Sequence, residues 1–444
     1  MKHNREAERR LYMLSSEAIM LAFHMLLIYL ILHNVYNSEF RTQLYARGHI
    51  MVLGIYAVCY VFLGNLFGGL LVGSRRGSEV MFSETFTALF ANGIFYLMVM
   101  MYSFSFPTIV PLLGATALQL LFSAAFIKTA SVIYRKLFRA YQVLLIYDGD
   151  AIDDFRRKLD TRRDQLNVTE SISAREPLEK IFARIDEMHT IIIWDLEVSL
   201  RNTIFKYCYD NSKRIFMAPK LSDIIYNGST SVHMFDTPLL LTEGSPLQYE
   251  ERVIKRFMDI VLSLILLVLT SPLMLLTALA VKLQDGGPVI YRQVRVTKGD
   301  REFEIMKFRS MIVDAEKQGA RLAREGDSRI TPVGRFIRKV RLDELPQLIN
   351  VLRGDMSFVG PRPERPEFIR EYVKDMPEFA YRTKVMAGLT GYAQLYGKYN
   401  TRPYDKLKLD LYYIESYSLW LDLKLMILTV KILFTAESTE GVKD

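Results

Sequence analysis

Two adjacent carboxylates, Asp343 and Glu344, lie in a stretch of basic residues and are the groups best suited to chemistry in this chain. Pro346 suits only the first turn of a helix and Gly354 is a typical helix stop, so we expect the two acids at or near the N-cap of a short helix. A helix start favours negative charge, whether a carboxylate or a phosphate. Acidic and basic side chains at a helix start suit phosphoryl chemistry with a divalent metal. The simpler alternative is that the aspartate only caps a solvated, charged helix. The neighbouring cations are Arg335, Arg338, Lys339 and Arg341.

Other stretches of the last third could complete such a site. Residues 289–296 and 302–307 alternate like two strands of a hairpin, and the second leads to Lys307 and Arg309. These two cations would share one strand face and could hold a phosphate, although a solvated hairpin face is equally compatible with the pattern. Farther on, a stiff loop carries Arg362 between two prolines, and the two glycines of the loop 388–391 would let backbone approach a ligand.

The composition predicts a membrane protein with soluble parts. The chain has 444 residues, which favours two or three domains, and half of them are hydrophobic although 24% are charged. The net charge of +8 fits an anionic partner such as lipid headgroups, nucleotides or phosphorylated substrates. Basic residues lie beside apolar runs rather than among aromatic residues, which argues against nucleic acid. Two cysteines, Cys59 and Cys208, are too few for a disulfide framework or a cysteine metal site.

Four apolar runs fill the first third, and each is near the roughly 20 residues that cross a bilayer as a helix. The first is too long for a signal-peptide core, so we expect it to be retained. Basic residues precede the first run, separate the second from the third, and follow the fourth, so the positive-inside rule predicts a four-helix bundle over 1–134 with both ends in the cytoplasm. The runs cover residues 14–33, 50–72, 85–103 and 108–127.

A small α/β domain is expected over residues 140–249. Strand patterns at 142–147, 190–194 and 214–218, with a helix at 152–159, are typical of a doubly wound, Rossmann-like sheet. The first strand ends in Asp148-Gly149-Asp150 rather than in a GxGxxG turn, and the two acids argue against dinucleotide binding. We therefore interpret this domain as structural or oligomerising.

A fifth apolar run, residues 257–283, is interrupted at its middle by Ser271 and Pro272. Pro272 removes a helix hydrogen bond, and the serine hydroxyl can bond a freed carbonyl, which predicts a sharp bend. Basic residues at both ends favour a re-entrant helix over 253–283 with both ends in the cytoplasm, the alternative being a kinked transmembrane helix. The apolar run at 417–434 carries three charged residues and predicts an amphipathic helix on the membrane surface, with docking on the soluble core as the alternative.

In their order along the chain, these motifs closely resemble the bacterial sugar transferases, also called monotopic phosphoglycosyl transferases. The resemblance covers about residues 251–434, and the Asp-Glu-Leu-Pro-Gln and Gly-Pro-Arg-Pro stretches carry most of it. With the bundle and the α/β domain, the chain looks like the larger members, the polyprenyl glycosylphosphotransferases. The implied architecture is a membrane helical bundle, a small α/β domain, and an α+β monotopic catalytic domain over 251–444 with a re-entrant helix.

The resemblance implies transfer of a sugar-1-phosphate, with a hexose preferred, from a UDP-sugar to undecaprenyl phosphate. This reaction starts exopolysaccharide or capsule synthesis on the cytoplasmic face of the bacterial inner membrane. Asp343 would be the nucleophile that expels UMP, and Glu344, with Asp343, would bind Mg²⁺. The residues expected to hold substrate phosphates or the nucleotide are Lys307, Arg309, Arg338 and Arg362.

The chain departs from the family where many members carry Gly-Arg-Asn, because it has Lys398 in place of the arginine. Either Lys398 or Arg402 would then grip phosphate, and a lysine provides a point charge rather than a bidentate fork. We expect a homodimer formed through the membrane bundle and the α/β domain. The alternative function is a non-catalytic scaffold of a polysaccharide assembly complex. The CDP-alcohol phosphotransferases are disfavoured, because their Asp-Gly motif has a counterpart only in Asp148-Gly149, at the end of a soluble strand.

Overall fold

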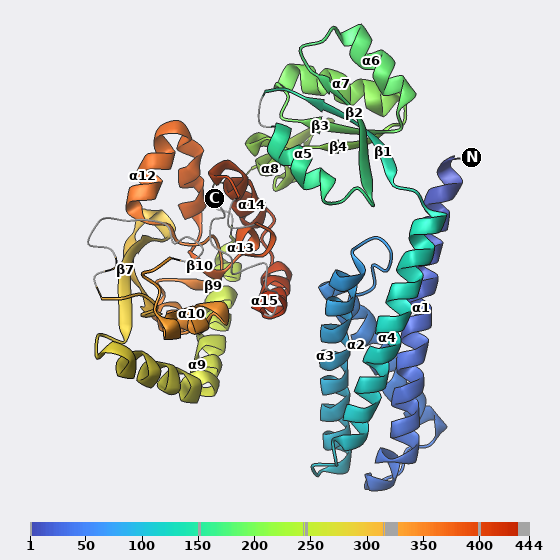
Figure 1. Ribbon diagram of the computed structural model, residues 1–444, viewed down its shortest axis with the longest axis vertical. Helices are drawn as coiled ribbons and strands as arrows, with labels where there is room; N and C mark the ends of the chain where they lie inside the picture. Colours follow the sequence, from blue (N-terminus) through green and yellow to red (C-terminus); the bar gives the residue numbers. More distant parts are fainter. Residues whose placement is uncertain are drawn as a thin grey trace. The chain divides into compact units, whose positions relative to one another are not determined.

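The computed structural model describes residues 2–149, 152–242, 244, 247–313, 315, 327–397 and 401–433. The chain forms two compact units, residues 1–218 and 219–444, and most of it is helical (Figure 1). This division assigns residues 219–249, which we predicted to end the α/β domain, to the second unit. The reason is visible in α8 (Leu221–Asn227), which packs against α14 (Pro403–Glu415) and buries Ile224 in the core of that unit.

The first part of unit 1 is a bundle of four long helices, which confirms the four predicted apolar helices. Each helix is long and apolar enough to cross a membrane, and neighbouring helices pack in the order α1–α2–α3–α4, with α1 closing against α4. Large apolar side chains such as Val58, Leu97 and Leu121 are exposed on the outside of the bundle. The helices are α1 (Lys2–Asn34), α2 (Ala46–Phe67), α3 (Gly77–Ser103) and α4 (Val110–Leu137), with the short turn η1 (Tyr36–Glu39) after α1.

The second part of unit 1 is a four-stranded parallel sheet in the order β2-β1-β3-β4, with helices on both faces. Ile181 of α6 and Ile204 of α7 pack on one face, and Leu159 of α5 packs on the other. The predicted strands β1, β3 and β4 and the predicted helix α5 are confirmed. The strand β2, in which threonine, glutamate and serine stand among the apolar residues, was not predicted. The elements are β1 (Tyr141–Tyr147), α5 (Ile152–Asp160), β2 (Leu166–Ser173), α6 (Leu178–Glu187), β3 (Thr190–Trp194), α7 (Val198–Asp210) and β4 (Arg214–Met217).

Unit 2 contains the fifth long apolar helix, α9 (Tyr249–Asp285), which runs for 37 residues and bends sharply in Figure 1. Pro272 lies inside this helix, and the Ser271 hydroxyl donates a hydrogen bond of 2.8 Å to the Val268 carbonyl. The Val268 carbonyl lies four residues before Pro272. It would ordinarily accept a hydrogen bond from the backbone N–H at position 272, which proline lacks. The predicted compensation of the proline by its neighbouring serine is therefore confirmed.

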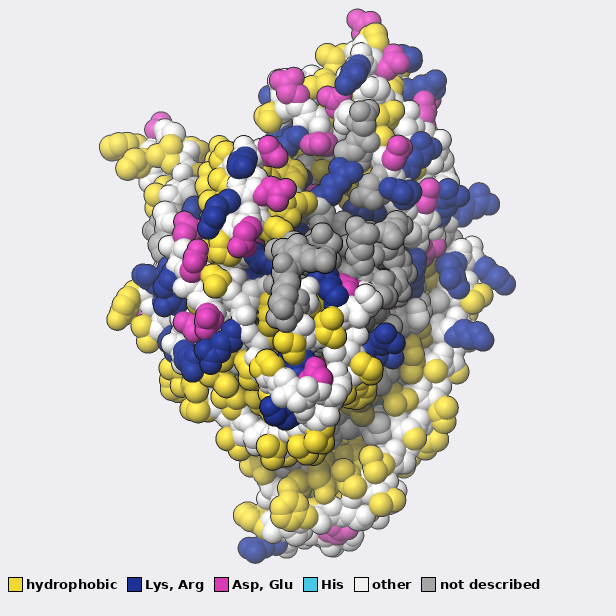
Figure 2. Space-filling view, turned by 60° about the vertical axis from the view of Figure 1, so that its left-hand side comes forward, with side chains coloured by type: hydrophobic (Ala, Val, Ile, Leu, Met, Phe, Trp, Pro, Cys, Tyr) yellow, Lys and Arg dark blue, Asp and Glu magenta, His cyan; other side chains and the backbone are white. Residues whose placement is uncertain are grey.

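The outer surface of α9 is apolar over most of its length. Val268, Leu269 and Leu276 are each more than half exposed, and Figure 2 shows hydrophobic side chains gathered along the bent helix with Lys and Arg side chains beside them. Only one narrow face, which includes Lys255 and Asp259, is buried against the rest of unit 2. An exposed apolar surface of this extent is typical of contact with lipid.

The remainder of unit 2 is a small α+β domain, and it confirms the predicted hairpin of β7 and β8. Its strands pair as antiparallel β5–β6, antiparallel β7–β8 and parallel β9–β10. The strands are β5 (Thr230–Met234), β6 (Thr237–Leu241), β7 (Ile290–Val296), β8 (Glu302–Phe308), β9 (Ser357–Val359) and β10 (Gly388–Thr390). The other elements are η2 (Lys298–Asp300), α10 (Pro332–Lys339), η3 (Leu342–Glu344), α11 (Gln347–Arg353), α12 (Pro366–Asp375), η4 (Pro377–Lys384), α13 (Tyr392–Tyr396) and α15 (Leu419–Leu433).

The helix α15 is docked on the core of unit 2, which confirms the alternative that the sequence left open. Contact of its exposed side with the membrane surface stays a prediction. Leu425 is fully buried in that core, and Asp422 is buried beside it. The charged residue that suggested an amphipathic surface helix is in fact an internal ion-pair partner of Lys255. Trp420 is half exposed on the outer side of the helix.

Candidate active site

The acidic pair lies in η3, a single 3-10 turn that comes before α11 rather than at its N-cap. The N-cap residue is Pro346, and Gly354 ends α11 in a left-handed conformation, as predicted. The turn is entered through Arg341, whose φ of 55° is unusual for a residue with a side chain. This conformation costs about 1–2 kcal/mol, so surrounding contacts must hold the turn in place.

Glu344 is held by three cations from three parts of the chain. Its Oε1 lies 2.8 Å from Arg362 Nη2 and 3.4 Å from Lys307 Nζ, and its Oε2 lies 3.7 Å from Arg341 Nη1. Burial alone would raise the pKa of Glu344, but the positive charges of Arg362 and Lys307 hold this pKa well below its ordinary value. Glu344 is therefore a fixed, ionised group.

Asp343 is the opposite case, because none of the described residues donates a hydrogen bond to its carboxylate or forms an ion pair with it. Burial, with the adjacent negative charge of Glu344 as the second cause, raises the pKa of Asp343 to about 6. Lys307 and Arg338 act in the other direction without pairing directly with the group. The pair thus consists of one anchored acid and one unpaired, more basic acid, and the second is the better nucleophile.

The structure brings three of the predicted phosphate-binding cations, Lys307, Arg338 and Arg362, around the acidic pair. Arg309 has other partners: its Nη1 lies 2.6 Å from Asp285 Oδ2, and its Nε donates to the Pro288 carbonyl at 2.7 Å. Lys307 and Arg309 therefore have different acidic partners, Glu344 and Asp285. The predicted role of Arg309 in binding substrate stays a prediction.

Lys398 and Arg402 are the two remaining residues predicted to bind substrate. Lys398 lies outside the described residues. Arg402 is exposed and forms the N-cap of α14. Their roles stay predictions.

The loop that carries Arg362 is held by backbone contact with the glycine loop 388–391. Gly360 N donates to the Thr390 carbonyl, and Gly388 N donates to the Pro361 carbonyl, both at 2.9 Å. A Cβ on Gly388 would lie 2.1 Å from the nitrogen of Gly360, which leaves no room for any side chain. The glycines predicted to admit a ligand instead allow these two loops to touch.

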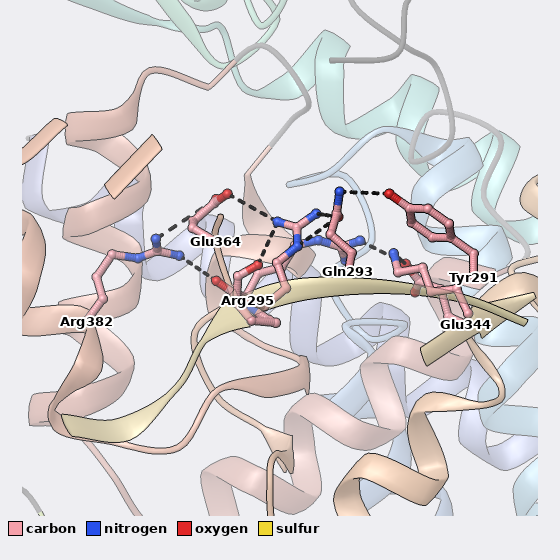
Figure 3. Close-up of polar contacts among 9 residues, drawn as sticks. Tyr291, Gln293, Arg295, Glu344, Glu364 and Arg382 are labelled. Carbon is pink, nitrogen blue, oxygen red and sulfur yellow. Dashed lines mark hydrogen bonds and ion pairs between the residues drawn. The ribbon is translucent and has the colours of Figure 1, made fainter. Parts of the chain in front are cut away.

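A row of charged residues behind this loop was missed by sequence reasoning. Arg382 is buried, lies 2.6 Å from Asp410 Oδ2, and donates to the Arg362 carbonyl at 3.0 Å. Arg295 donates to the Pro363 carbonyl at 3.1 Å, and Figure 3 shows Arg382, Glu364 and Arg295 in one row of polar contacts. The available signal was Asp410, a charged residue on the otherwise apolar buried face of α14.

The membrane-facing helix α9 also holds the elements of the site. Asp259 Oδ1 accepts hydrogen bonds from Phe358 N at 2.9 Å and from the Ser357 hydroxyl at 3.1 Å, and Lys255 donates to the Val359 carbonyl at 3.0 Å. Arg256 donates to the last carbonyls of α11, at 2.6 and 2.7 Å. One helix thus fixes both β9, which leads to Arg362, and α11, which follows the acidic pair.

Replacing Asp259 with Ala should lower the melting temperature of the full chain in lipid nanodiscs. The change leaves a buried backbone N–H and a hydroxyl without an acceptor, which costs about 1–3 kcal/mol for each such group. Asp259→Asn is the matched control, because its amide oxygen can still accept both hydrogen bonds, and its loss should be clearly smaller. Equal losses for Ala and Asn would show that the charge of Asp259, not its acceptor geometry, is what matters.

Comparison with known proteins identifies the second unit. The family model described as bacterial sugar transferase matches residues 250–436. A Caulobacter vibrioides protein described as UDP-glucose:undecaprenyl-phosphate glucose-1-phosphate transferase is 41% identical over 206 residues, which cover 45% of this chain and 77% of that protein. The chain therefore belongs to the bacterial sugar transferase family.

Two larger relatives match the same part of the chain. An Aeromonas hydrophila UDP-N-acetylgalactosamine-undecaprenyl-phosphate N-acetylgalactosaminephosphotransferase is 47% identical over 185 residues, or 41% of this chain and 44% of that protein. A UDP-glucose:undecaprenyl-phosphate glucose-1-phosphate transferase of Escherichia coli is 41% identical over 209 residues, or 46% of this chain and 43% of that protein. The matched segment thus spans less than half of the length of these two relatives.

Proposed function

We propose that this chain transfers a sugar-1-phosphate from a UDP-sugar to undecaprenyl phosphate and so initiates the synthesis of an exopolysaccharide or capsule glycan. The observation that carries the proposal is the unequal acidic pair, in which Glu344 is tied to cations while Asp343 is unpaired and has a raised pKa. The relatives are described as transferases that use undecaprenyl phosphate with UDP-glucose or UDP-N-acetylgalactosamine, which supports the two substrates. The sugar is proposed only as far as a UDP-linked hexose or its derivative.

The proposed reaction has two steps on one phosphorus atom. A carboxylate oxygen of Asp343 attacks the sugar-side phosphorus of the UDP-sugar, the bond to the bridging oxygen breaks, and UMP leaves with that electron pair. A phosphate oxygen of undecaprenyl phosphate then attacks the same phosphorus and releases the Asp343 carboxylate. Lys307, Arg338 and Arg362 attract the phosphate oxygens in both steps, so two anionic substrates can use one cationic site in turn.

The donor set of the site fits Mg²⁺, which we propose as the cofactor. The described residues contain no group of three or more metal-ligating side chains. Mg²⁺, however, is commonly bound through one or two carboxylates with substrate phosphates and waters, so Asp343 and Glu344 suffice. When bound, the ion would neutralise charge on the transferring phosphoryl group. Asp343 offers carboxylate oxygens that no described residue occupies.

The finer membrane arrangement is also part of the proposal. The bend of α9 and the Ser271–Val268 hydrogen bond support a re-entrant helix, which would keep the whole catalytic unit at the cytoplasmic face of the inner membrane. The parallel sheet of unit 1 supports a Rossmann-like domain with a structural role. A homodimer stays a prediction.

The first test is UMP release by the full chain in nanodiscs with undecaprenyl phosphate, Mg²⁺ and a panel of UDP-sugars. We expect release with UDP-glucose, UDP-galactose or an N-acetylated analogue, and loss of release on addition of EDTA that excess Mg²⁺ restores. Release that continues unchanged in EDTA would contradict the metal requirement alone. Absence of release with every UDP-sugar would favour a non-catalytic scaffold or another nucleotide.

A further inference from the structure

The interior of the membrane bundle contains ionisable side chains that the proposed reaction does not use. His24 of α1, Tyr60 of α2, Glu84 of α3 and Ser123 of α4 are all fully buried. The Tyr60 hydroxyl donates to Glu84 Oε1 at 2.5 Å, and His24 Nε2 lies 3.4 Å from the same oxygen and 3.2 Å from Ser123 Oγ. An acid and a base are therefore in direct contact in an apolar bundle, where ionisable groups are costly and usually functional.

This cluster has unused hydrogen-bonding capacity. Glu84 Oε2 and His24 Nδ1 are buried and have no hydrogen-bond partner among the described residues. The backbone after α2 closes over the carboxyl group, since a Cβ on Gly69 would lie 3.2 Å from Glu84 Oε2. In the described part of the chain, the hydrogen-bond and ion-pair partners of this carboxyl group are Tyr60 and His24, and of these two only His24 can carry a positive charge.

Among the described residues, His24 is the one basic side chain that contacts Glu84. The titratable groups that face the cluster are Glu17 of α1 and Tyr56 and Tyr60 of α2, while α4 contributes the neutral Ser123. Arg75 lies beside Gly68, and the described part of the chain contains no ion pair between Arg75 and Glu84. An ionised Glu84 beside a neutral His24 would thus be an isolated negative charge in the membrane.

A purely structural network does not explain this pair, because a satisfied one lies next to it. Tyr56 donates to Asn92 Oδ1 at 3.0 Å, and the Asn92 amide donates to Thr116 at 2.8 Å and to Gln119 at 2.7 Å. These neutral groups already join α2, α3 and α4. An amide at position 84 would serve the same purpose at lower cost than an acid.

We propose that Glu84 and His24 form a proton-binding site that holds one exchangeable proton within the bundle. With this proton the pair is neutral overall, either as carboxylic acid and imidazole or as carboxylate and imidazolium. The proton moves between Glu84 Oε1 and His24 Nε2, and no other bond changes. Its release leaves one negative charge in the bundle interior. The site is separate from the phosphoryl site and does not depend on the proposed transferase function.

The direction in which stability changes with pH follows from the number of protons that the folded and the unfolded chain hold. Above about pH 6.5, the ordinary pKa of histidine, the unfolded chain holds no proton on either group, whereas the folded pair still holds one. The folded state then binds more protons, so its stability falls as the pH rises above that value. Glu84→Gln removes this dependence.

The test measures the melting temperature of the full chain in nanodiscs from pH 5 to 9. The melting temperature of Glu84→Gln should rise relative to that of the wild type by about 3 °C per pH unit from pH 6.5 up to the pH at which the folded pair releases its proton. Glu79→Gln, on the same helix at a half-exposed position, should follow the wild type. His24→Gln should already lose stability as the pH rises from 5 to 6.5, because Glu84 alone then holds the proton and an unfolded glutamate has lost it by pH 5. A difference between Glu84→Gln and wild type that is constant with pH would overturn the proposal and leave a structural role.

A second measurement does not depend on whether these variants fold. Infrared difference spectroscopy of wild-type chain with isotope-labelled glutamate and histidine, titrated from pH 6.5 to 9, should reveal loss of one proton from a buried carboxyl or imidazole. The titrating signal should exchange slowly with solvent deuterium. If no buried glutamate or histidine signal changes over this range, the proposal fails.

Discussion

Replacing Asp343 with Asn should reduce UMP release on the order of 10⁴-fold or more, because an amide cannot replace the attacking carboxylate. The substitution is nearly isosteric, and Asp343 has no partner among the described residues, so the folded structure should persist. The cations on Glu344 are untouched. The measurement is the rate of UMP release at saturating UDP-sugar and undecaprenyl phosphate.

A trapping experiment separates the nucleophile from a merely electrostatic role. Incubated with sugar-labelled UDP-sugar and no acceptor, the wild-type chain should acquire covalent label, and Asp343→Asn should acquire none. Asp300→Asn, in an exposed turn of the same unit, is the matched control and should label like the wild type. Turnover retained by Asp343→Asn, or label retained on it, would assign the attack to another group.

The pH dependence of kcat/KM should follow the raised pKa of Asp343, to which burial contributes most and the charge of Glu344 second. Since the pKa of Asp343 is raised to about 6, kcat/KM for the wild type should fall about tenfold per unit as the pH drops below 6. Glu344→Gln removes the negative charge that contributes to this shift, so the acid limb should move to lower pH. The same change releases Arg362 and Lys307, and activity at pH 8 should fall by about 10²–10³-fold.

Glu302→Gln, on the exposed start of β8, is the control for the loss of one acidic charge. Its profile should coincide with that of the wild type. An acid limb that stays near pH 6 in Glu344→Gln would mean that burial alone sets the basicity of Asp343. A limb near pH 4 in the wild type would contradict the raised pKa itself.

Local features of the chain could be predicted from sequence because their causes are local. The Pro272 defect and its repair by Ser271 involve one turn of helix, and the hairpin of β7 and β8 follows from alternation over short runs. The acidic pair could be recognised from the basic residues, the proline and the glycine that lie close to it in the sequence. Its inequality could not be predicted, since the cations that separate the two acids, Lys307 and Arg362, are 37 and 18 positions from Glu344.

Long-range pairing also limits what the sequence can predict. The ion pair between Arg309 and Asp285, 24 positions away at the end of α9, cannot be recognised from the residues next to Arg309. Asp422 suggested a surface helix because its partner Lys255 is 167 positions away. The two partners of a buried ion pair can lie far apart in the sequence, where nothing links them. Only the fold shows which charged side chains are paired with each other.

The contacts of α9 have a practical consequence for anyone who wishes to handle the catalytic unit without lipid. A shortened chain that begins after α9 would lack Asp259, Lys255 and Arg256. It would also lack the hydrogen bonds that fix β9 and the end of α11. The remaining fragment would be water-compatible in composition but would lack the framework that orients Arg362 and the acidic turn. Solubility and activity are therefore coupled through a single helix, and a soluble version requires redesign of its exposed leucines rather than its deletion.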